Sequence, residues 1–411
     1  MDNFFDVNFT ILKMSGIWIP ETTTKLSIKL MYLLYNILWI GYSCLFFCPS
    51  ELVYLVNTFS NMEDLVKNVN MGMTHFLANI KVCLWFYYRK EIISIIETLG
   101  AYGRRYESSG DFRAEEIVQK AKKFKDTFSV LFLTFAMFTS ISSCLICFLS
   151  VLRMEIPDGK DIDFKLPYFS YIPFNYKASK LVFSVAIWYQ FFPVFNYAYI
   201  IVGFDTLYTA ILAYVSAQLD IIQGAFSTIR PRCIARLGLK LPTDILKDPP
   251  LLMEDMNKEM NKIVDHLQVL LNICRRLEEI YTNVILAQVM ISLIVFCTCI
   301  FLVSLLPMMS LNFAAEMIYL IAIECQLLIY CVFGNKVTVS SSNIPNSIYN
   351  GDWYSTSTSF KRSMLITMAR MQRPIYFTIG KFTPLTLSTF LTISRASYSL
   401  FAVLKNSDLS N

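Results

Sequence analysis

Long apolar stretches without charged residues recur along this chain. Residues 30–50, 127–152 and 181–204 contain no Asp, Glu, Lys or Arg. A helix needs about 20 mainly apolar residues to cross roughly 30 Å of hydrocarbon. Each of these three stretches therefore predicts one membrane-spanning helix.

A fourth uncharged stretch covers residues 280–315 and is too long for one crossing. Pro307 and Asn312 interrupt it, and such residues mark helix boundaries. The stretch therefore predicts two spans, a helix that ends near Leu306 and a second helix over residues 312–333.

Two weaker stretches complete the set. Residues 69–88 contain His75 and Lys81 but are otherwise free of acidic and basic side chains, and residues 384–404 contain Arg395. A central Arg costs a lipid-facing helix about 3 kcal/mol, whereas a helix that lines a watery path tolerates it. The last stretch therefore favours a pore wall, with hydrogen bonding between neighbouring helices as an equal alternative. Its hydroxyl residues are Thr386, Ser388, Thr389, Thr392, Ser394, Ser397 and Ser399.

The basic residues of the connecting loops predict how seven spans are oriented. One side of the membrane receives 26 Lys and Arg and the other side 7. Because basic loops stay in the cytoplasm, we expect a cytoplasmic N-terminus and an extracellular C-terminus. A G-protein-coupled receptor has the opposite orientation.

A heptad pattern extends the fifth span into the cytoplasm. Apolar residues recur there at alternating intervals of four and three, which is typical of a helix that packs along one seam. Residues 205–226 similarly continue the fourth span, and residues 114–128 form a helix that leads into the third span. Residues 229–250 predict an irregular connection. Packing within the chain and packing between subunits remain equal alternatives. The heptad residues are Met256, Met260, Ile263, Leu267, Leu270, Cys274, Leu277 and Tyr281.

Composition supports an integral membrane protein. Hydrophobic residues make up 55% of the chain and charged residues 16%, which is too apolar for a soluble fold. The net charge of +5 comes from basic residues scattered over short loops, so we expect no nucleic-acid partner. His75 and His266 have no partners at metal-ligand or catalytic spacing, and no Gly-rich phosphate loop is present. We therefore expect no enzyme activity, no metal and no cofactor.

The last third of the chain contains motifs that resemble those of insect odorant receptors. They include YCVFGN at 330–335, MARMQRP at 368–374 and LTLSTF at 385–390, and they occur in the order that the family shows. The seven-span plan with an inside N-terminus also fits that family. Further matching positions are Glu324, Ser340, Ile348, Tyr349, Trp353, Tyr354, Gly380, Lys381, Phe382, Ser397, Tyr398 and Ser399.

The resemblance implies a fold and an activity. The fold is an all-α membrane protein with a cytoplasmic helical anchor, in a tetrameric ion-channel architecture whose seventh helix lines the pore. The activity is that of an odorant-gated, non-selective cation channel. By count from the end motif, the closing hydrophobic ring falls at Val403, with Leu400 and Leu404 beside it. Residues 1–334 then carry the odorant pocket and residues 335–411 the anchor segment and the pore helix.

The resemblance also implies an apolar pocket for a small volatile among the second, third, fourth and sixth helices. Burial of apolar surface would supply most of the affinity there, at about 25 cal/mol per Å². The candidate positions are Met71, His75, Phe76, Asn79, Ser142, Leu145, Leu149, Phe183, Ile187, Gln190, Phe191, Phe313, Met317 and Leu320.

The expected partners follow from the same family. The chain resembles a ligand-tuning subunit, so we expect a hetero-oligomeric channel, a tetramer, with the shared olfactory co-receptor. It would span the plasma membrane of a sensory neuron's dendrite, contact lipid and pass cations. A gustatory receptor channel of the same superfamily is the nearest alternative, although no Gln-Phe follows Ser397 and Tyr398. A G-protein-coupled receptor is a more distant one.

Overall fold

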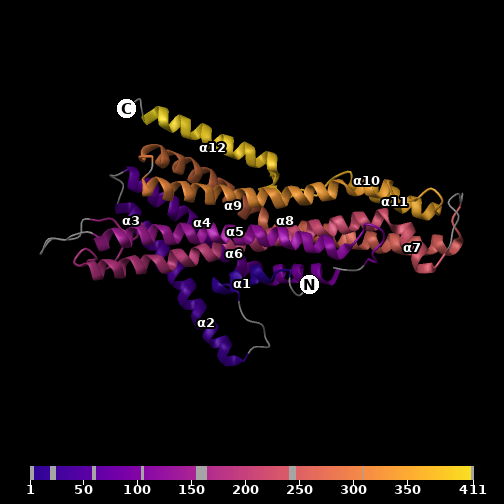
Figure 1. The fold of residues 1–411 in the computed structure, drawn as a ribbon, viewed down its shortest axis with the longest axis horizontal. Helices are drawn as coiled ribbons and strands as arrows, with labels where there is room; N and C mark the ends of the chain where they lie inside the picture. Colours follow the sequence, from indigo (N-terminus) through magenta and orange to yellow (C-terminus); the bar gives the residue numbers. More distant parts are fainter. Residues whose placement is uncertain are drawn as a thin grey trace.

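Long helices that lie side by side along one direction make up the computed structural model (Figure 1). Shorter helices and two short strands are the other regular elements among the described residues. The structure describes residues 4–18, 25–57, 62–102, 106–153, 164–239, 247–308 and 310–408.

Each of the seven predicted spans falls in one long helical segment. Among the described residues, five segments are long and apolar enough to cross a membrane. The other two predicted spans, in α4 and α12, do not reach that apolar level. The first span runs without a gap through α2, a π-helical segment η1, and α3. The segments are α2 (Leu26–Gly41), η1 (Tyr42–Phe47), α3 (Cys48–Asn57), α4 (Met62–Tyr102), α5 (Ala114–Arg153), α6 (Lys180–Ser227), α8 (Pro250–Leu305), α9 (Leu311–Ser342) and α12 (Leu387–Asp408).

The chain breaks between the fifth and sixth spans where the sequence predicts. Helix α8 ends at Leu305, two residues before Pro307, and α9 begins at Leu311. The hydroxyl of Ser310 caps α9 by accepting a hydrogen bond from the amide of Phe313 at 3.0 Å. The predicted division into two helices is confirmed.

Helix α6 is the centre of the bundle. In its most apolar window 94% of the residues are buried, and α1 (Asp6–Met14), α4, α5, α8 and α9 all pack against it. A helix that is apolar on every side is stable only when other helices surround it. Helix α6 therefore fixes the positions of the helices that form the cavity described below.

The heptad residues of α8 are all buried within the chain itself. The N-terminal part of α8 packs on α7 (Ile229–Leu237) and α11 (Thr358–Met371), which gather with α10 (Ile344–Tyr349) at one end of the bundle (Figure 1). The heptad seam therefore serves packing within one chain. The prediction of an irregular connection over residues 229–250 is wrong for α7, because Arg232 and Arg236 hold that short helix on Glu259 of α8.

A tight hairpin leads into the last helix. Strands β1 (Thr378–Ile379) and β2 (Thr383–Pro384) pair antiparallel, and two of the three turn residues between them, Gly380 and Lys381, have positive φ. Leu385, just after the hairpin, lies so close to α9 that a Cβ on Gly334 would sit 2.6 Å from its carbonyl oxygen. Gly334 and Gly380, each from one of the sequence motifs, thus allow the hairpin to form and to pack closely on α9.

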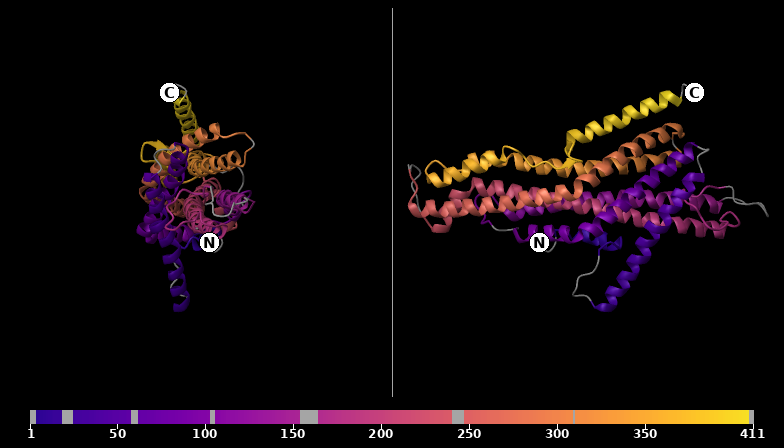
Figure 2. Two further views of the ribbon diagram at one scale, coloured as in Figure 1. Left: turned by 90° about the vertical axis from the view of Figure 1, so that its left-hand side faces the viewer. Right: turned by 180° about the vertical axis from the view of Figure 1, so that it is seen from behind.

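Helix α12 leaves the bundle on the side opposite to α2 (Figure 2). It packs on α8 and α9 through residues such as Thr389 and Ser397, which are buried. The far face is exposed, and it carries a polar stripe at helical spacing. The stripe consists of Ser388, Thr392, Arg395 and Ser399.

We expect Gly334→Ala to destabilise the chain by about 1–3 kcal/mol, because the added methyl must push the hairpin off α9. Thermal unfolding of the purified protein would measure this loss. Gly41→Ala is the matched control, since no described atom lies within 4 Å of a Cβ there and Ala favours helix by about 1 kcal/mol. Equal stability of the two variants would contradict this account of the hairpin.

Candidate functional site

An apolar cavity lies among α4, α5, α6 and α9, the second, third, fourth and sixth spanning helices. Its free volume is about 80 Å³, which is below the roughly 300–1,000 Å³ of typical drug-sized sites. A small molecule fits such a space better than a large one. The lining residues are Met71, Thr74, His75, Phe132, Ala136, Thr139, Ser140, Tyr168, Val194, Tyr197, Ala198, Ile201, Tyr319, Ala322, Ile323 and Gln326.

The loop before α6 covers one end of the cavity. Gln190 holds this loop, because its amide nitrogen donates to the Tyr168 carbonyl at 2.7 Å and to the Ser170 hydroxyl at 2.8 Å. Its amide oxygen accepts from the Tyr168 backbone nitrogen at 3.2 Å. The hydroxyl of Tyr168 in turn donates to the Ser140 carbonyl at 3.1 Å. The loop is thus tied to both α5 and α6.

A buried ion pair lies next to the other end of the cavity. The Lys81 ammonium of α4 lies 2.5 Å from Asp205 Oδ1 of α6 and 2.6 Å from Gln288 Oε1 of α8, and both charged side chains are at most 1% exposed. Two groups of α9 complete the shell, because Gln326 Nε2 donates to Asp205 Oδ2 and the Tyr330 hydroxyl to Oδ1, each at 2.6 Å. The network connects four helices.

Pairing of the two charges is what makes this buried network stable. A charged group in an apolar interior costs several kcal/mol unless hydrogen bonds and an opposite charge replace water. Asp205 accepts three hydrogen bonds here, and Lys81 donates two. The helices can therefore separate at this level only at a high cost in free energy.

A second polar pair borders the cavity from α4. His75 Nδ1 lies 2.9 Å from both carboxylate oxygens of Glu51 on α3, and both residues are buried. The imidazole ring stacks on Tyr197, with ring centroids 4.3 Å apart. Glu51 therefore fixes the orientation of His75 beside the cavity.

The structure places two of the predicted pocket residues, Met71 and His75, in the lining of this cavity. Gln190 and Asn79 lie behind it, since Gln190 holds the loop and Asn79 Oδ1 accepts from the Tyr197 hydroxyl at 3.0 Å. Phe76, Leu145 and Leu149 are exposed on the outside of the bundle. The remaining predicted positions, which the structure also leaves out of the lining, are Ser142, Phe183, Ile187, Phe191, Phe313, Met317 and Leu320.

The difference between prediction and structure is one of depth. On α6 the lining begins at Val194 instead of Phe183, and on α9 it extends to Gln326 instead of ending at Leu320. The cavity thus lies nearer the middle of α6 and α9 than most of the predicted positions, whose contact with a ligand stays a prediction. Gln326 is one of three polar residues well inside the predicted sixth span, with Glu316 and Glu324, and it is the one that lines the cavity.

Helix α9 connects the cavity to α12. Ile323 lines the cavity on one side, and on the other it borders a smaller cavity shared with Ile393 and Ser397 of α12. The next residue, Glu324, accepts a hydrogen bond from the Ser394 hydroxyl at 3.2 Å. A shift of α9 therefore acts directly on α12.

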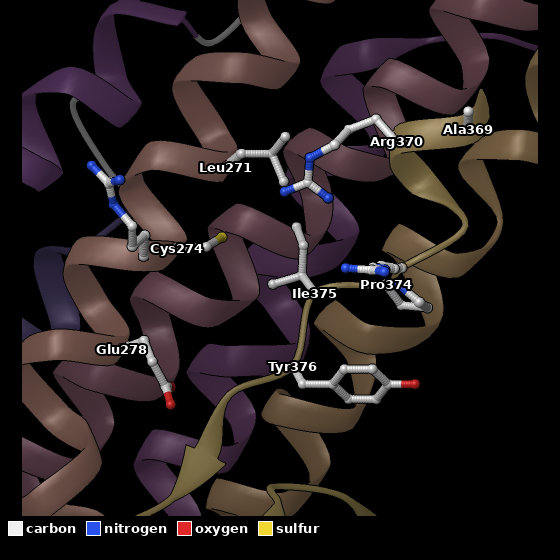
Figure 3. Close-up of a pocket in the computed structure, with 10 residues that line it drawn as sticks. Leu271, Cys274, Glu278, Ala369, Arg370, Pro374, Ile375 and Tyr376 are labelled. Carbon is white, nitrogen blue, oxygen red and sulfur yellow. The ribbon is translucent and has the colours of Figure 1, made fainter. Parts of the chain in front are cut away.

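A larger groove of about 680 Å³ lies on the surface between α8 and the end of α11. Figure 3 shows Leu271, Cys274 and Glu278 of α8 on one side and the chain that follows α11 on the other, with Arg370 reaching across. Burial raises the pKa of Cys274 to about 12, so its thiol stays protonated and is no nucleophile. The groove is charged and open, which does not suit an apolar volatile.

The predicted hydrophobic ring lies on α12. Leu400, Val403 and Leu404 belong to α12, but their side chains lie outside the described residues. Among the residues that the structure describes, no group of three or more His, Cys, Asp or Glu side chains is arranged to hold a metal ion.

Comparison with known proteins gives consistent matches. The family model for the 7tm odorant receptor matches residues 61–398. The chain is 24% identical to Odorant receptor 2a of Drosophila melanogaster, over 97% of this chain and 95% of that one. It is 33% identical to Odorant receptor 10 of Aedes albopictus, over 21% of this chain and 23% of that one.

Solved structures show the same fold. The insect olfactory receptor OR5 from Machilis hrabei superposes with a TM-score of 0.75 at 13% identity, over 97% of this chain and 96% of that one. The same receptor in complex with eugenol gives a TM-score of 0.72, again at 13% identity, over 98% and 97% of the two chains.

We expect Lys81→Met to destabilise the protein by about 3–5 kcal/mol, because it leaves the Asp205 carboxylate buried without its counter-charge. The double variant Lys81→Met with Asp205→Asn should recover much of that loss. Thermal unfolding in detergent would compare them with Arg113→Met, which breaks an exposed ion pair to Glu116 and should cost less than about 1 kcal/mol. A loss for Lys81→Met no larger than that of the control would refute the role of the pair.

Proposed function

This chain belongs to the 7tm odorant receptor family, and on that premise we propose that it binds a small volatile compound in the α4–α5–α6–α9 cavity and gates a non-selective cation channel. The family consists of receptors, so the chain is not an enzyme. The matching family model is that of odorant receptors, and we therefore set aside the gustatory and G-protein-coupled alternatives.

The lining of the cavity supports the ligand-binding part of the proposal. Most lining groups are apolar or aromatic, and they can bind a volatile by burying its surface at about 25 cal/mol per Å². Met71 and His75 keep the role that the sequence predicts for them. The other predicted positions surround this cavity or lie nearer the ends of the helices.

The exposed stripe of α12 supports the pore. Ser388, Thr392, Arg395 and Ser399 face away from the chain's own bundle, and lipid would leave such a stripe poorly solvated. In an oligomer with α12 at the centre, the stripe would face water. Some of its hydroxyls also bond their own helix, as Thr392 does to the Ser388 carbonyl at 3.0 Å, but that does not satisfy Arg395.

One observation carries the gating proposal: α9 contacts the cavity with one face and α12 with the other. A ligand shifts a conformational equilibrium only if it binds one state more tightly. We infer that the volatile fits the open state better, displaces α9, and moves α12 through Ile323 and Glu324. The hydrophobic ring of Val403, Leu400 and Leu404 then widens and admits cations.

The assembly part of the proposal rests on the family and the charge distribution. We propose a tetramer with the olfactory co-receptor, in the plasma membrane of a sensory dendrite, with the N-terminus inside and the C-terminus outside. Residues 1–334 would bind the ligand, and residues 335–411 would form the anchor and the pore. This division is one of function and not of structural domains, because α9 runs unbroken across it.

We expect Ala198→Leu to raise the odorant concentration for half-maximal current about tenfold or more, because the added carbons occupy the ligand's space. Currents would be recorded from cells that express the chain with and without the co-receptor, against a panel of volatiles. Val185→Leu, on the exposed face of the same helix, is the matched control and should respond like the natural chain.

Two results would contradict this proposal. One is an unchanged odorant response in Ala198→Leu together with normal surface expression. The other is the absence of any odorant-gated current from the natural chain with its co-receptor, which would remove the channel function itself.

We expect Val403→Cys to make the odorant-gated current sensitive to a charged, membrane-impermeant thiol reagent added outside the cell. The reagent reaches this position only if α12 lines a pore whose end at residue 403 opens to the outside, and the current should then fall irreversibly. The natural chain, with its eleven cysteines, is the control. If the reagent blocks the current only when it is added from inside the cell, the proposed orientation of α12 is reversed. If it has no effect from either side, residue 403 does not line the pore.

A further inference from the structure

The hydrogen-bond donors around the cavity are already in use. The Tyr197 hydroxyl donates to the Ser43 carbonyl at 2.8 Å, and the Thr139 hydroxyl donates to the Phe135 carbonyl at 2.6 Å. The Ser140 hydroxyl donates to its own helix at 3.1 Å. Thr74 and Tyr319 share a hydrogen bond of 2.8 Å, and each also reaches the Asn70 carbonyl. A ligand therefore finds few free donors in these walls.

Gln326 offers the cavity an acceptor. Its amide nitrogen is already bonded to other residues, and its amide oxygen is left for a ligand. Its amide nitrogen donates to Asp205 Oδ2 at 2.6 Å and to Gln288 Oε1 at 3.3 Å. A flipped amide would place its oxygen 2.6 Å from the Asp205 carboxylate oxygen, and two acceptor oxygens at that distance repel each other. The network therefore fixes the orientation of this amide.

The amide oxygen of Gln326 receives no hydrogen bond from any residue that the structure describes. Gln326 is 4% exposed and lines the cavity. An amide oxygen in an apolar wall gains from any donor that a ligand brings.

We propose that this cavity selects small volatiles that carry a hydroxyl group, alcohols or phenols, through a hydrogen bond from that hydroxyl to Gln326 Oε1. The proposal deepens the function proposed above and rests on it. An ether or a ketone has no hydrogen to donate, and its oxygen would be buried without a partner. Ionised carboxylates are excluded for the same reason, since they only accept.

The test compares isomers that differ in the position of one oxygen atom. The probes are p-ethylphenol against p-methylanisole and n-heptanol against hexyl methyl ether, applied to the natural chain with its co-receptor. One buried hydrogen bond to an acceptor that otherwise lacks a partner should lower the half-maximal concentration of the hydroxyl isomer about fivefold to tenfold. Current recordings measure this ratio directly.

The variant Gln326→Met removes the acceptor and nearly keeps the volume. The ratio between isomers should fall to about twofold or less, while the ether isomer still evokes current. Thr139→Val is the matched control, because it changes a lining residue whose hydroxyl is already bonded within its own helix. It should keep the preference of the natural chain.

The possible results separate the ligand class, the role of Gln326 and the receptor function. A natural chain that answers volatiles but does not prefer the hydroxyl isomer of either pair refutes the ligand class and leaves the receptor function intact. Preference that survives in Gln326→Met refutes the role of Gln326. If Gln326→Met fails to reach the surface, the comparison of isomers on the natural chain still decides the ligand class. No current with any volatile refutes the proposed function itself.

Discussion

The buried pair of Lys81 and Asp205 is the constraint on which the rest of this structure depends. An ammonium and a carboxylate can lie inside a membrane bundle only if an opposite charge and hydrogen bonds take the place of water around them. Matching them brings Gln288 and Gln326 to one point and ties α4, α6, α8 and α9 together. The same requirement turns the amide of Gln326, so the ion pair also determines which polar atom the cavity presents.

The cavity lies directly above this rigid level, between the network and the loop that Gln190 holds. Motion on ligand binding is therefore easiest in the apolar walls between the two, where dispersion contacts are individually weak. Helix α9 contributes to both regions, because Gln326 belongs to the network and Ile323 faces α12 one turn away. A tilt of α9 about the fixed network would move Ile323 and Glu324 while it leaves the ion pair intact.

The sequence was sufficient for the helices but not for the cavity. Apolar length, the break at Pro307 and the heptad seam of α8 depend on neighbours in sequence, and these predictions are confirmed. The depth of the cavity depends on how far helices slide past one another, which no local pattern encodes, so the sequence does not predict where along α6 its lining begins. Lys81 looked like an irregularity in a weak span because its partner Asp205 is 124 positions away in the chain.

The division between a fixed network and variable walls bears on how such a receptor changes its ligand. Substitutions among Val194, Ala198 and Ala322 alter the shape of the cavity without touching a buried charge, so their cost is limited to packing. A substitution of Asp205 or Lys81 would strand the opposite charge, and a substitution of Gln326 would remove one hydrogen bond from Asp205 as well as the cavity's acceptor. Size selectivity can therefore change freely, whereas selectivity for a hydrogen-bond donor is linked to the interaction that holds the helices together.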